Sequence, residues 1–314
     1  MSDTIRAART GPALKQVPLT RSWATRVLYA VEYALFWSVM ALFRALGLKR
    51  ASDLGGWLAR TLGPMIPVTR QARRAMALAF PEMNVATRET HIRAMWDNLG
   101  RTFAEYPHLD KIWSVKPGAR IEIAGMDHAQ AAIAKGKGGL FVSGHAGNWE
   151  LLARCIGDVG LKGTLVYRPP NNPWVDAWIA KQRRLGLPTM AAKGGDGARV
   201  IIKALKENAF IGMLIDQKAN DGISVPLFGR EAMTSPAAPS LSLKHGAPIV
   251  PAWCERLPDQ RFRVTVYPEI PMPHSGDKGR DTYELALALN KFLEARIADN
   301  PANWLWLHSR WPKS

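Results

Sequence analysis

Residues 139–158 read GLFVSGHAGNWELLARCIGD and contain the clearest strand-to-helix transition in the chain. The first seven residues form a short apolar run typical of a buried strand, whereas residues 148–158 have the apolar spacing of a helix. A strand that leads directly into a helix indicates an α/β fold, with helices packed on the faces of a sheet. His145 lies at the turn between the two elements.

The same alternation continues along the rest of the chain. We predict one α/β domain over residues 51–314, with a mixed sheet flanked by helices, preceded by a basic N-terminus and a hydrophobic membrane helix over residues 1–50. The further strands are predicted at 164–168, 210–216, 247–253 and 261–267, and the helices at 52–62, 69–80, 87–106, 173–185, 197–207, 236–245 and 281–298. Ser52 and Thr69 are expected to cap the first two of these helices.

The composition is that of a folded protein. The 314 residues are 47% hydrophobic and 22% charged, which excludes a disordered, collagen-like or coiled-coil chain. Cys155 and Cys254 are too few for a disulfide framework or a zinc cluster, and they indicate a reducing compartment. The seven histidines are scattered and no H-E-x-x-H motif occurs, so we expect no metal.

The net charge of +16 favours a polyanionic partner such as nucleic acid, anionic lipid or an acidic protein. Its distribution favours lipid, because residues 1–80 hold 12 basic and 3 acidic side chains around the most apolar segment. That segment, Val27 to Phe43, is 17 residues long, at the lower limit for a membrane-spanning helix. Basic residues flank both of its ends, so spanning the bilayer, lying along it and packing in a core all stay open.

His145 and Glu150 are the candidate catalytic pair. They are five residues apart across a strand-to-helix turn, so we expect both side chains in one cleft and a hydrogen bond from the imidazole to Glu150. No serine or cysteine nucleophile lies beside them. A base without a protein nucleophile favours activation of an acceptor hydroxyl for attack on an acyl group, although a structural histidine is the alternative.

The motif FVSGHAGNWELLA resembles the H-x4-E motif of the bacterial lipid A biosynthesis acyltransferases, a branch of the lysophospholipid acyltransferase superfamily. Three further blocks follow in the same order as in that family. They are YRPPNNP at 167–173, Asp216-Gln217 with PLFG at 226–229, and WLWLHSRW at 304–311.

The resemblance implies a glycerolipid-acyltransferase-like fold and assigns roles to particular residues. His145 would deprotonate the acceptor hydroxyl, Glu150 would orient and polarise it, and Arg183 would stabilise the oxyanion. Arg168 and Asn172 would bind phosphate or position the donor. Asp216 and Gln217 are further candidates for substrate binding. Asp216 is better suited to a structural role, or to pairing with an arginine, than to acting as a second base. The side chains of Trp149, Trp174 and Trp178 are candidates to line an acyl tunnel.

The function implied is acyl transfer from acyl carrier protein to a hydroxyl of a Kdo-bearing lipid A precursor, without a cofactor. It would take place at the bacterial inner membrane, with the catalytic domain on the cytoplasmic side and membrane lipids, not nucleic acid, as partners. Three alternatives stay open: transfer to another glycolipid or a lysophospholipid from acyl-CoA, thioester hydrolysis, and a basic membrane or nucleic-acid-binding protein. Acyl chain length, acceptor position and oligomeric state are open as well.

Overall fold

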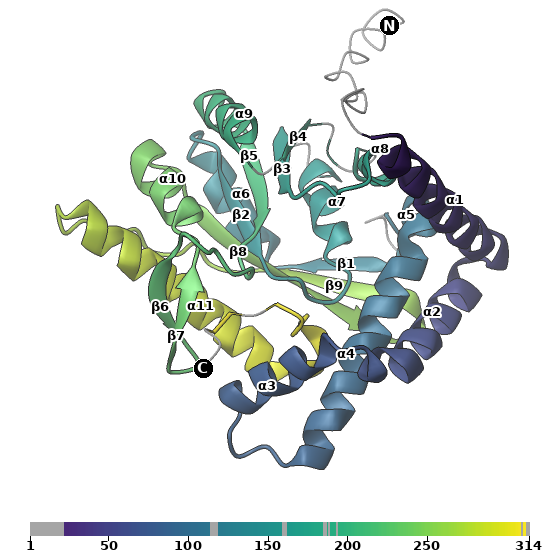
Figure 1. Ribbon diagram of the computed structural model, residues 1–314. Helices are drawn as coiled ribbons and strands as arrows, with labels where there is room; N and C mark the ends of the chain where they lie inside the picture. Colours follow the sequence, from purple (N-terminus) through teal and green to yellow (C-terminus); the bar gives the residue numbers. More distant parts are fainter. Residues whose placement is uncertain are drawn as a thin grey trace, which may run out of the picture.

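The computed structural model describes residues 22–113, 119–158, 162–184, 187, 189–192, 194–308 and 310–311. At its centre is a seven-stranded sheet of strand order β1-β9-β8-β2-β5-β3-β4 (Figure 1). Neighbouring strands are parallel except β8 and β9, which confirms the expected mixed α/β sheet. The strands are β1 (Ile121–Ala124), β2 (Gly139–Ser143), β3 (Gly163–Tyr167), β4 (Thr189–Ala192), β5 (Phe210–Leu214), β8 (Ile249–Leu257) and β9 (Arg261–Val266), with a separate hairpin of β6 (Ile223–Leu227) and β7 (Arg230–Thr234).

Helices cover both faces of this sheet. Every residue of β2 is buried, as expected for a central strand with helices on both sides. Phe141 packs in a cluster with α6 and α7, while its neighbour Val142 packs on the opposite face with α9, α10 and α11. These helices are α6 (Met126–Ala134), α7 (Glu150–Asp158), α8 (Pro173–Arg183), α9 (Gly195–Lys206), α10 (Ala237–His245) and α11 (Lys278–Asp299).

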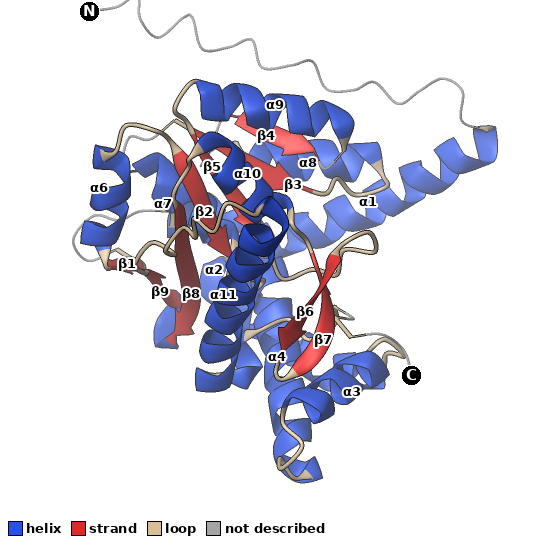
Figure 2. Cartoon of the chain, turned by 90° about the vertical axis from the view of Figure 1, so that its left-hand side faces the viewer, coloured by secondary structure: helices blue, strands red, loops and turns tan. Residues whose placement is uncertain are grey.

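The N-terminal third forms a helical layer beside the sheet (Figure 2). Helices α2 and α4 approach closely at two glycines, since a Cβ on Gly100 would lie 2.1 Å from the carbonyl oxygen of Gly55. The layer consists of α1 (Trp23–Leu46), α2 (Leu48–Leu62), α3 (Thr69–Ala79), α4 (Val85–Glu105), α5 (Leu109–Ile112) and the short 3-10 turns Gly63–Met65 and Tyr106–His108.

Helix α1 is the hydrophobic helix expected from the sequence. Ser22 caps it and Gly47, with a φ of 76°, ends it. One stripe, including Phe36, Met40 and Phe43, packs inward. The remaining surface is apolar and exposed, and Trp37 is 54% exposed. The helix is long and apolar enough to cross a membrane, with 11% of its apolar window buried.

Several boundaries differ from the sequence prediction. Ser52 and Thr69 were expected to cap helices, but α2 already begins at Leu48 and α3 follows Val68. Their hydroxyls are buried instead and donate to Glu105 and to the Gly63 carbonyl. The sequence prediction also lacked six helices and strands, namely β1, α5, α6, β4, β6 and β7.

Candidate active site

His145 lies where β2 gives way to α7. Ala146 forms a bridge with Trp304, and Gly147 turns the chain with a φ of 54°. A Cβ on Gly147 would lie 2.6 Å from the Cys254 carbonyl oxygen, so this position requires glycine on both conformational and steric grounds. The turn leaves the His145 side chain 13% exposed.

Asp216 fixes the orientation of His145. The two Asp216 oxygens accept from Nδ1 and from the backbone N–H of His145, each at 2.7 Å. A carboxylate only accepts, so Nδ1 carries the hydrogen and Nε2 of the neutral ring is left as the acceptor. Trp304 Nε1 donates to the same carboxylate at 2.7 Å, and Arg310 donates to the Asp216 carbonyl. Burial opposes the charge on Asp216, but His145 and His308 hold the pKa of this carboxyl well below its usual range.

This arrangement corrects two expectations. The hydrogen-bond partner of the imidazole is Asp216, not Glu150. Asp216 was also expected to bind substrate, but it is fully buried behind His145 and does not line the cavity described below. Its neighbour Gln217 does line that cavity, with its amide nitrogen 3.5 Å from His145 Nε2.

Glu150 instead pairs with Arg183. The guanidinium donates through Nε at 2.7 Å and through Nη2 at 2.6 Å, a bidentate geometry, and it also donates to the Tyr106 hydroxyl. Burial disfavours both charges, but their mutual attraction lowers the pKa of Glu150 and raises that of Arg183. Trp149 Nε1 donates to Glu150 as well. The two side chains therefore form a buried ion pair of fixed geometry.

His308 is a site residue to which the sequence analysis gave no role. Its ring centroid lies 4.9 Å from that of His145, and burial lowers its pKa to about 4. His308, Trp304 and Arg310 all belong to the segment WLWLHSRW. That segment was noted only as part of a family resemblance; its density of polar and aromatic side chains was the available signal.

Arg168 and Asn172 have different surroundings. Arg168 lines the cavity, as its expected role requires. The Asn172 side chain is 6% exposed and caps α8, while its amide donates to the Tyr29 carbonyl and to Glu32 of α1. Asn172 thus joins two helices in this structure, and it does not line the cavity.

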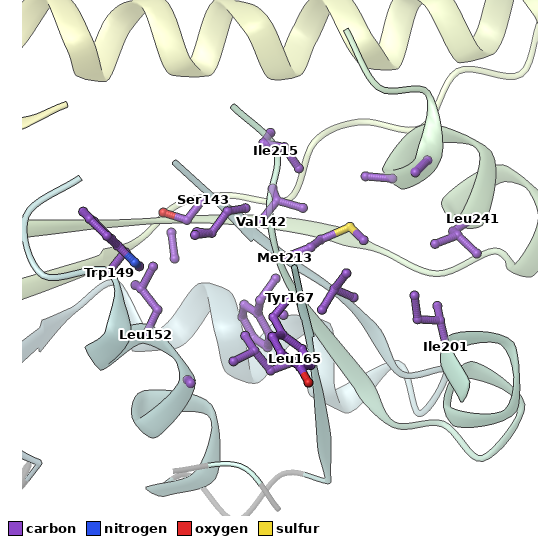
Figure 3. Close-up of a pocket in the computed structure, with 18 of the residues that line it drawn as sticks. Val142, Ser143, Trp149, Leu152, Leu165, Tyr167, Ile201, Met213, Ile215 and Leu241 are labelled. Atoms are coloured by element: carbon purple, nitrogen blue, oxygen red, sulfur yellow. The ribbon is translucent and has the colours of Figure 1, made fainter. Parts of the chain in front are cut away.

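A cavity of about 570 Å³ opens beside His145 (Figure 3). His145, Glu150, Arg168, Arg183 and Gln217 line its polar part, and the rest of its wall is largely apolar. Of the three tryptophans expected to line an acyl tunnel, Trp149 lines this cavity. Trp174 and Trp178 pack against Tyr33 and Phe36 of α1 instead. No group of three or more metal-ligating side chains occurs among the described residues.

An imidazole oriented by a buried carboxylate, with an arginine on the wall of the same largely apolar cavity, suits the transfer of an acyl group to a lipid. The chain belongs to the bacterial lipid A biosynthesis acyltransferase family, whose model matches residues 20–313.

Two kinds of relative are similarly close. A phosphatidylinositol mannoside acyltransferase of Mycobacterium tuberculosis is 26% identical over 299 residues, covering 93% of this chain and 91% of its own. The lipid A biosynthesis lauroyltransferase of Escherichia coli is 30% identical over 242 residues and 76% of each chain. A palmitoleoyltransferase of lipid A biosynthesis from the same bacterium is 27% identical over 247 residues, 76% of this chain and 77% of its own.

Proposed function

We propose that this acyltransferase moves a fatty acyl group from acyl carrier protein to a hydroxyl of a lipid A precursor, Kdo-bearing lipid IVA. The reaction takes place at the cytoplasmic face of the bacterial inner membrane. The observation that carries the proposal is the Asp216–His145 pair beside the Glu150–Arg183 pair at one apolar cavity.

The acceptor hydroxyl is activated by His145. Nε2 takes the hydroxyl proton while Asp216, bonded to Nδ1, stabilises the imidazolium that forms. The acceptor oxygen then bonds to the thioester carbonyl carbon. When the carbon–sulfur bond breaks, the imidazolium returns the proton to the leaving thiolate, so the protein is unchanged at the end of the cycle.

Arg183 stabilises the oxyanion of the tetrahedral intermediate. Its guanidinium is at the cavity wall and stays charged because of Glu150. Removing one such donor from an oxyanion site typically costs about 10²–10³ in rate. Glu150, whose oxygens are occupied by Arg183 and Trp149, acts by holding this guanidinium rather than by polarising the acceptor.

The choice of partners is supported by charge. Acyl carrier protein is acidic and lipid A precursors carry phosphates and acidic sugars, so a chain of net charge +16 suits both. A glycolipid mannose is the second candidate acceptor, because the mycobacterial relative aligns with 93% of this chain.

Mass spectrometry of the acceptor tests the proposal. Purified protein is incubated with a Kdo-bearing tetraacylated lipid A precursor, a phosphatidylinositol mannoside or a lysophospholipid, and with acyl carrier protein or coenzyme A thioesters. We expect a gain of one acyl group on the lipid A precursor. The gain should be lost in His145→Ala and kept in His274→Ala, a control at an exposed histidine. Acylation of only the mannoside or the lysophospholipid would contradict the proposed acceptor.

A further inference from the structure

A second buried ion pair, Glu105–Arg256, lies outside the cavity wall. Glu105 belongs to α4 and is fully buried, and Arg256 lies near the end of β8. The guanidinium donates to both carboxylate oxygens, through Nη1 at 2.5 Å and through Nη2 at 3.1 Å. The pair therefore joins the N-terminal helical layer to the sheet. Neither residue lines the cavity, and neither takes part in the proposed proton transfer.

The pair directs hydrogen bonds onto the turn between β2 and α7. Arg256 Nε donates to Asn98 Oδ1 at 2.8 Å, and Nη2 donates to the Thr102 hydroxyl at 3.0 Å. A guanidinium has no acceptor, so both of these α4 side chains accept from it. Their own donors then point to the Gly147 carbonyl, at 3.0 Å from Asn98 and 3.1 Å from Thr102. The charge on Arg256 thus sets the direction in which the two side chains donate.

The next residue of the turn is bound to the same pair. The Asn148 side chain is fully buried, and its amide donates to Glu105 Oε2 at 2.8 Å. Two consecutive residues are therefore fixed to one charged cluster, Gly147 through its carbonyl and Asn148 through its side chain. His145 precedes them and Glu150 follows them in the chain.

Stability alone does not account for two charges at this place. Taking an ion pair out of water is costly, and an apolar pair of similar volume is often equally stable or more stable. An apolar pair cannot supply direction, because only charged groups of this kind impose a donor or an acceptor on each neighbour. The neighbours oriented here include Asn98, Thr102 and Asn148, the side chains that fix the turn.

We propose that Glu105 and Arg256 are positioning residues for acyl transfer. By fixing the turn they set the place of His145 Nε2 relative to Glu150, and hence relative to the Arg183 guanidinium that Glu150 binds. A displacement of about 1 Å between such groups can cost about 10²-fold in rate. This inference rests on the proposed function, because it uses the roles given there to His145 and Arg183.

Thr102 allows a test that changes little else. Thr102→Val keeps the shape of the buried side chain but removes the hydroxyl between Arg256 and the Gly147 carbonyl. We expect kcat for acyl transfer to fall about tenfold. KM for the thioester should stay within about twofold of the wild-type value, since the cavity wall is unchanged. Thr102→Ser restores the hydroxyl and should keep most of the wild-type kcat. Thr90→Val, at an exposed threonine of the same helix, is the matched control.

Replacing the ion pair by an apolar pair separates positioning from stability. Glu105→Leu leaves the Arg256 charge buried without its carboxylate and should lower the free energy of unfolding. Adding Arg256→Met removes that charge, so the free energy of unfolding should return toward the wild-type value. In the double variant kcat should stay at least about tenfold below wild type, because no charge then directs Asn98 and Thr102. Denaturant titration and acyl-transfer assays measure the two effects.

A wild-type kcat in the double variant, together with recovered stability, would overturn the proposal, because the pair would then act on stability alone. An unchanged kcat in Thr102→Val, or an equal loss in Thr102→Ser, would overturn it as well. Failure of the proposed function differs from these outcomes. A wild-type protein that acylates a mannoside instead of the lipid A precursor contradicts only the acceptor, and the variants are then compared on the mannoside.

Discussion

Asp216 gives His145 its orientation, and its removal tests that role directly. In Asp216→Asn the amide can offer a donor where Nδ1–H needs an acceptor, so the ring loses its defined tautomer. We expect the transfer rate to fall about 10²–10⁴-fold with the fold retained. Steady-state kinetics with circular dichroism measures both. Asp221→Asn, at an exposed loop position, is the matched control, and a wild-type rate in Asp216→Asn would contradict the assignment.

A double variant separates the structural effect of the Glu150–Arg183 pair from the catalytic effect proposed for it. Glu150→Gln leaves the buried Arg183 charge unpaired, which should destabilise the protein by about 3–5 kcal/mol. Adding Arg183→Met removes that charge, so the free energy of unfolding should return toward the wild-type value. Acyl transfer should be lost in both the single and the double variant, because neither keeps a positioned Arg183 guanidinium. Denaturant titration and transfer assays on the single and double variants measure this. Recovery of activity in the double variant would exclude Arg183 as the oxyanion donor.

His308 makes stability depend on pH. Burial lowers its pKa to about 4, below the ordinary 6.5, so between these values the unfolded chain binds a proton that the folded protein does not. Stability is therefore lost as pH falls from 6.5 to 4, by roughly 3 kcal/mol from this group. His308→Gln should reduce that slope. The free energy of unfolding of the wild type and of His308→Gln is measured at pH 7.5, 5.5 and 4.5. An equal change of this free energy with pH in both proteins would contradict a buried neutral His308.

The sequence pointed to His145 as a candidate, but it did not identify the hydrogen-bond partner of this residue. Glu150 is five residues away, whereas Asp216 is 71 residues away and reaches His145 only because β2 and β5 are neighbours in the sheet. A single sequence shows strands but not their order. For the same reason the sequence did not predict that Trp304 and His308, which follow α11 in the chain, lie at the site.

Among the elements, α1 and α8 depend on each other. Helix α8 carries Arg183, and Asn172 at its start binds the Tyr29 carbonyl and Glu32 of α1. Further along α8, Trp178 meets Phe36 with ring centroids 5.2 Å apart. The inner face of α1 thus supports the helix that carries Arg183, the proposed oxyanion donor.

The neighbouring residues Phe36 and Trp37 test this support. Phe36 packs inward, whereas Trp37 is exposed. In detergent, Phe36→Ala should lower kcat about tenfold or more, because Arg183 loses its fixed place, and Trp37→Ala should not. In flotation with anionic vesicles, Trp37→Ala should weaken binding. Equal loss of detergent activity in both variants would contradict a positioning role for the inner face.

Periodicity predicted long elements well and short ones poorly. The apolar run at 27–43 and the buried strand at 139–145 correspond to α1 and β2. The β6–β7 hairpin was missed because Phe228 and Gly229 form its turn with φ values of 51° and 66°, and a phenylalanine there gives no turn signal. Ser52 and Thr69 resembled helix caps, but their hydroxyls donate to Glu105 and to the Gly63 carbonyl instead.

For the whole molecule, the contacts of α1 decide how it meets the membrane. Its inner face is held at several points along its length, by Asn172 near Tyr29, by His108 at the Phe43 carbonyl and by Asp110 at Arg44. These contacts favour a helix that stays docked on the folded domain over one that crosses the bilayer. We therefore expect α1 to lie along the interface, with its exposed apolar side in the lipid.

Cysteine labelling distinguishes the two topologies. Cysteines placed at Ala24 and Ala45, both exposed near the two ends of α1, are treated with an impermeant maleimide in sealed inverted vesicles. The native Cys155 and Cys254 are buried and give the background. Both new sites should react from the same side. Reaction at only one of them would establish a spanning helix.

The position of Trp304 in the chain has a consequence for biosynthesis. Its indole and the Arg310 guanidinium secure Asp216, yet both residues are translated after every strand of the sheet and after α11. Helix α1, by contrast, precedes all of them and leaves the ribosome first. The nascent protein can therefore reach the membrane surface before Trp304 and Arg310 secure Asp216, the hydrogen-bond partner of His145. We therefore expect an incompletely synthesised chain not to act on its acyl donor.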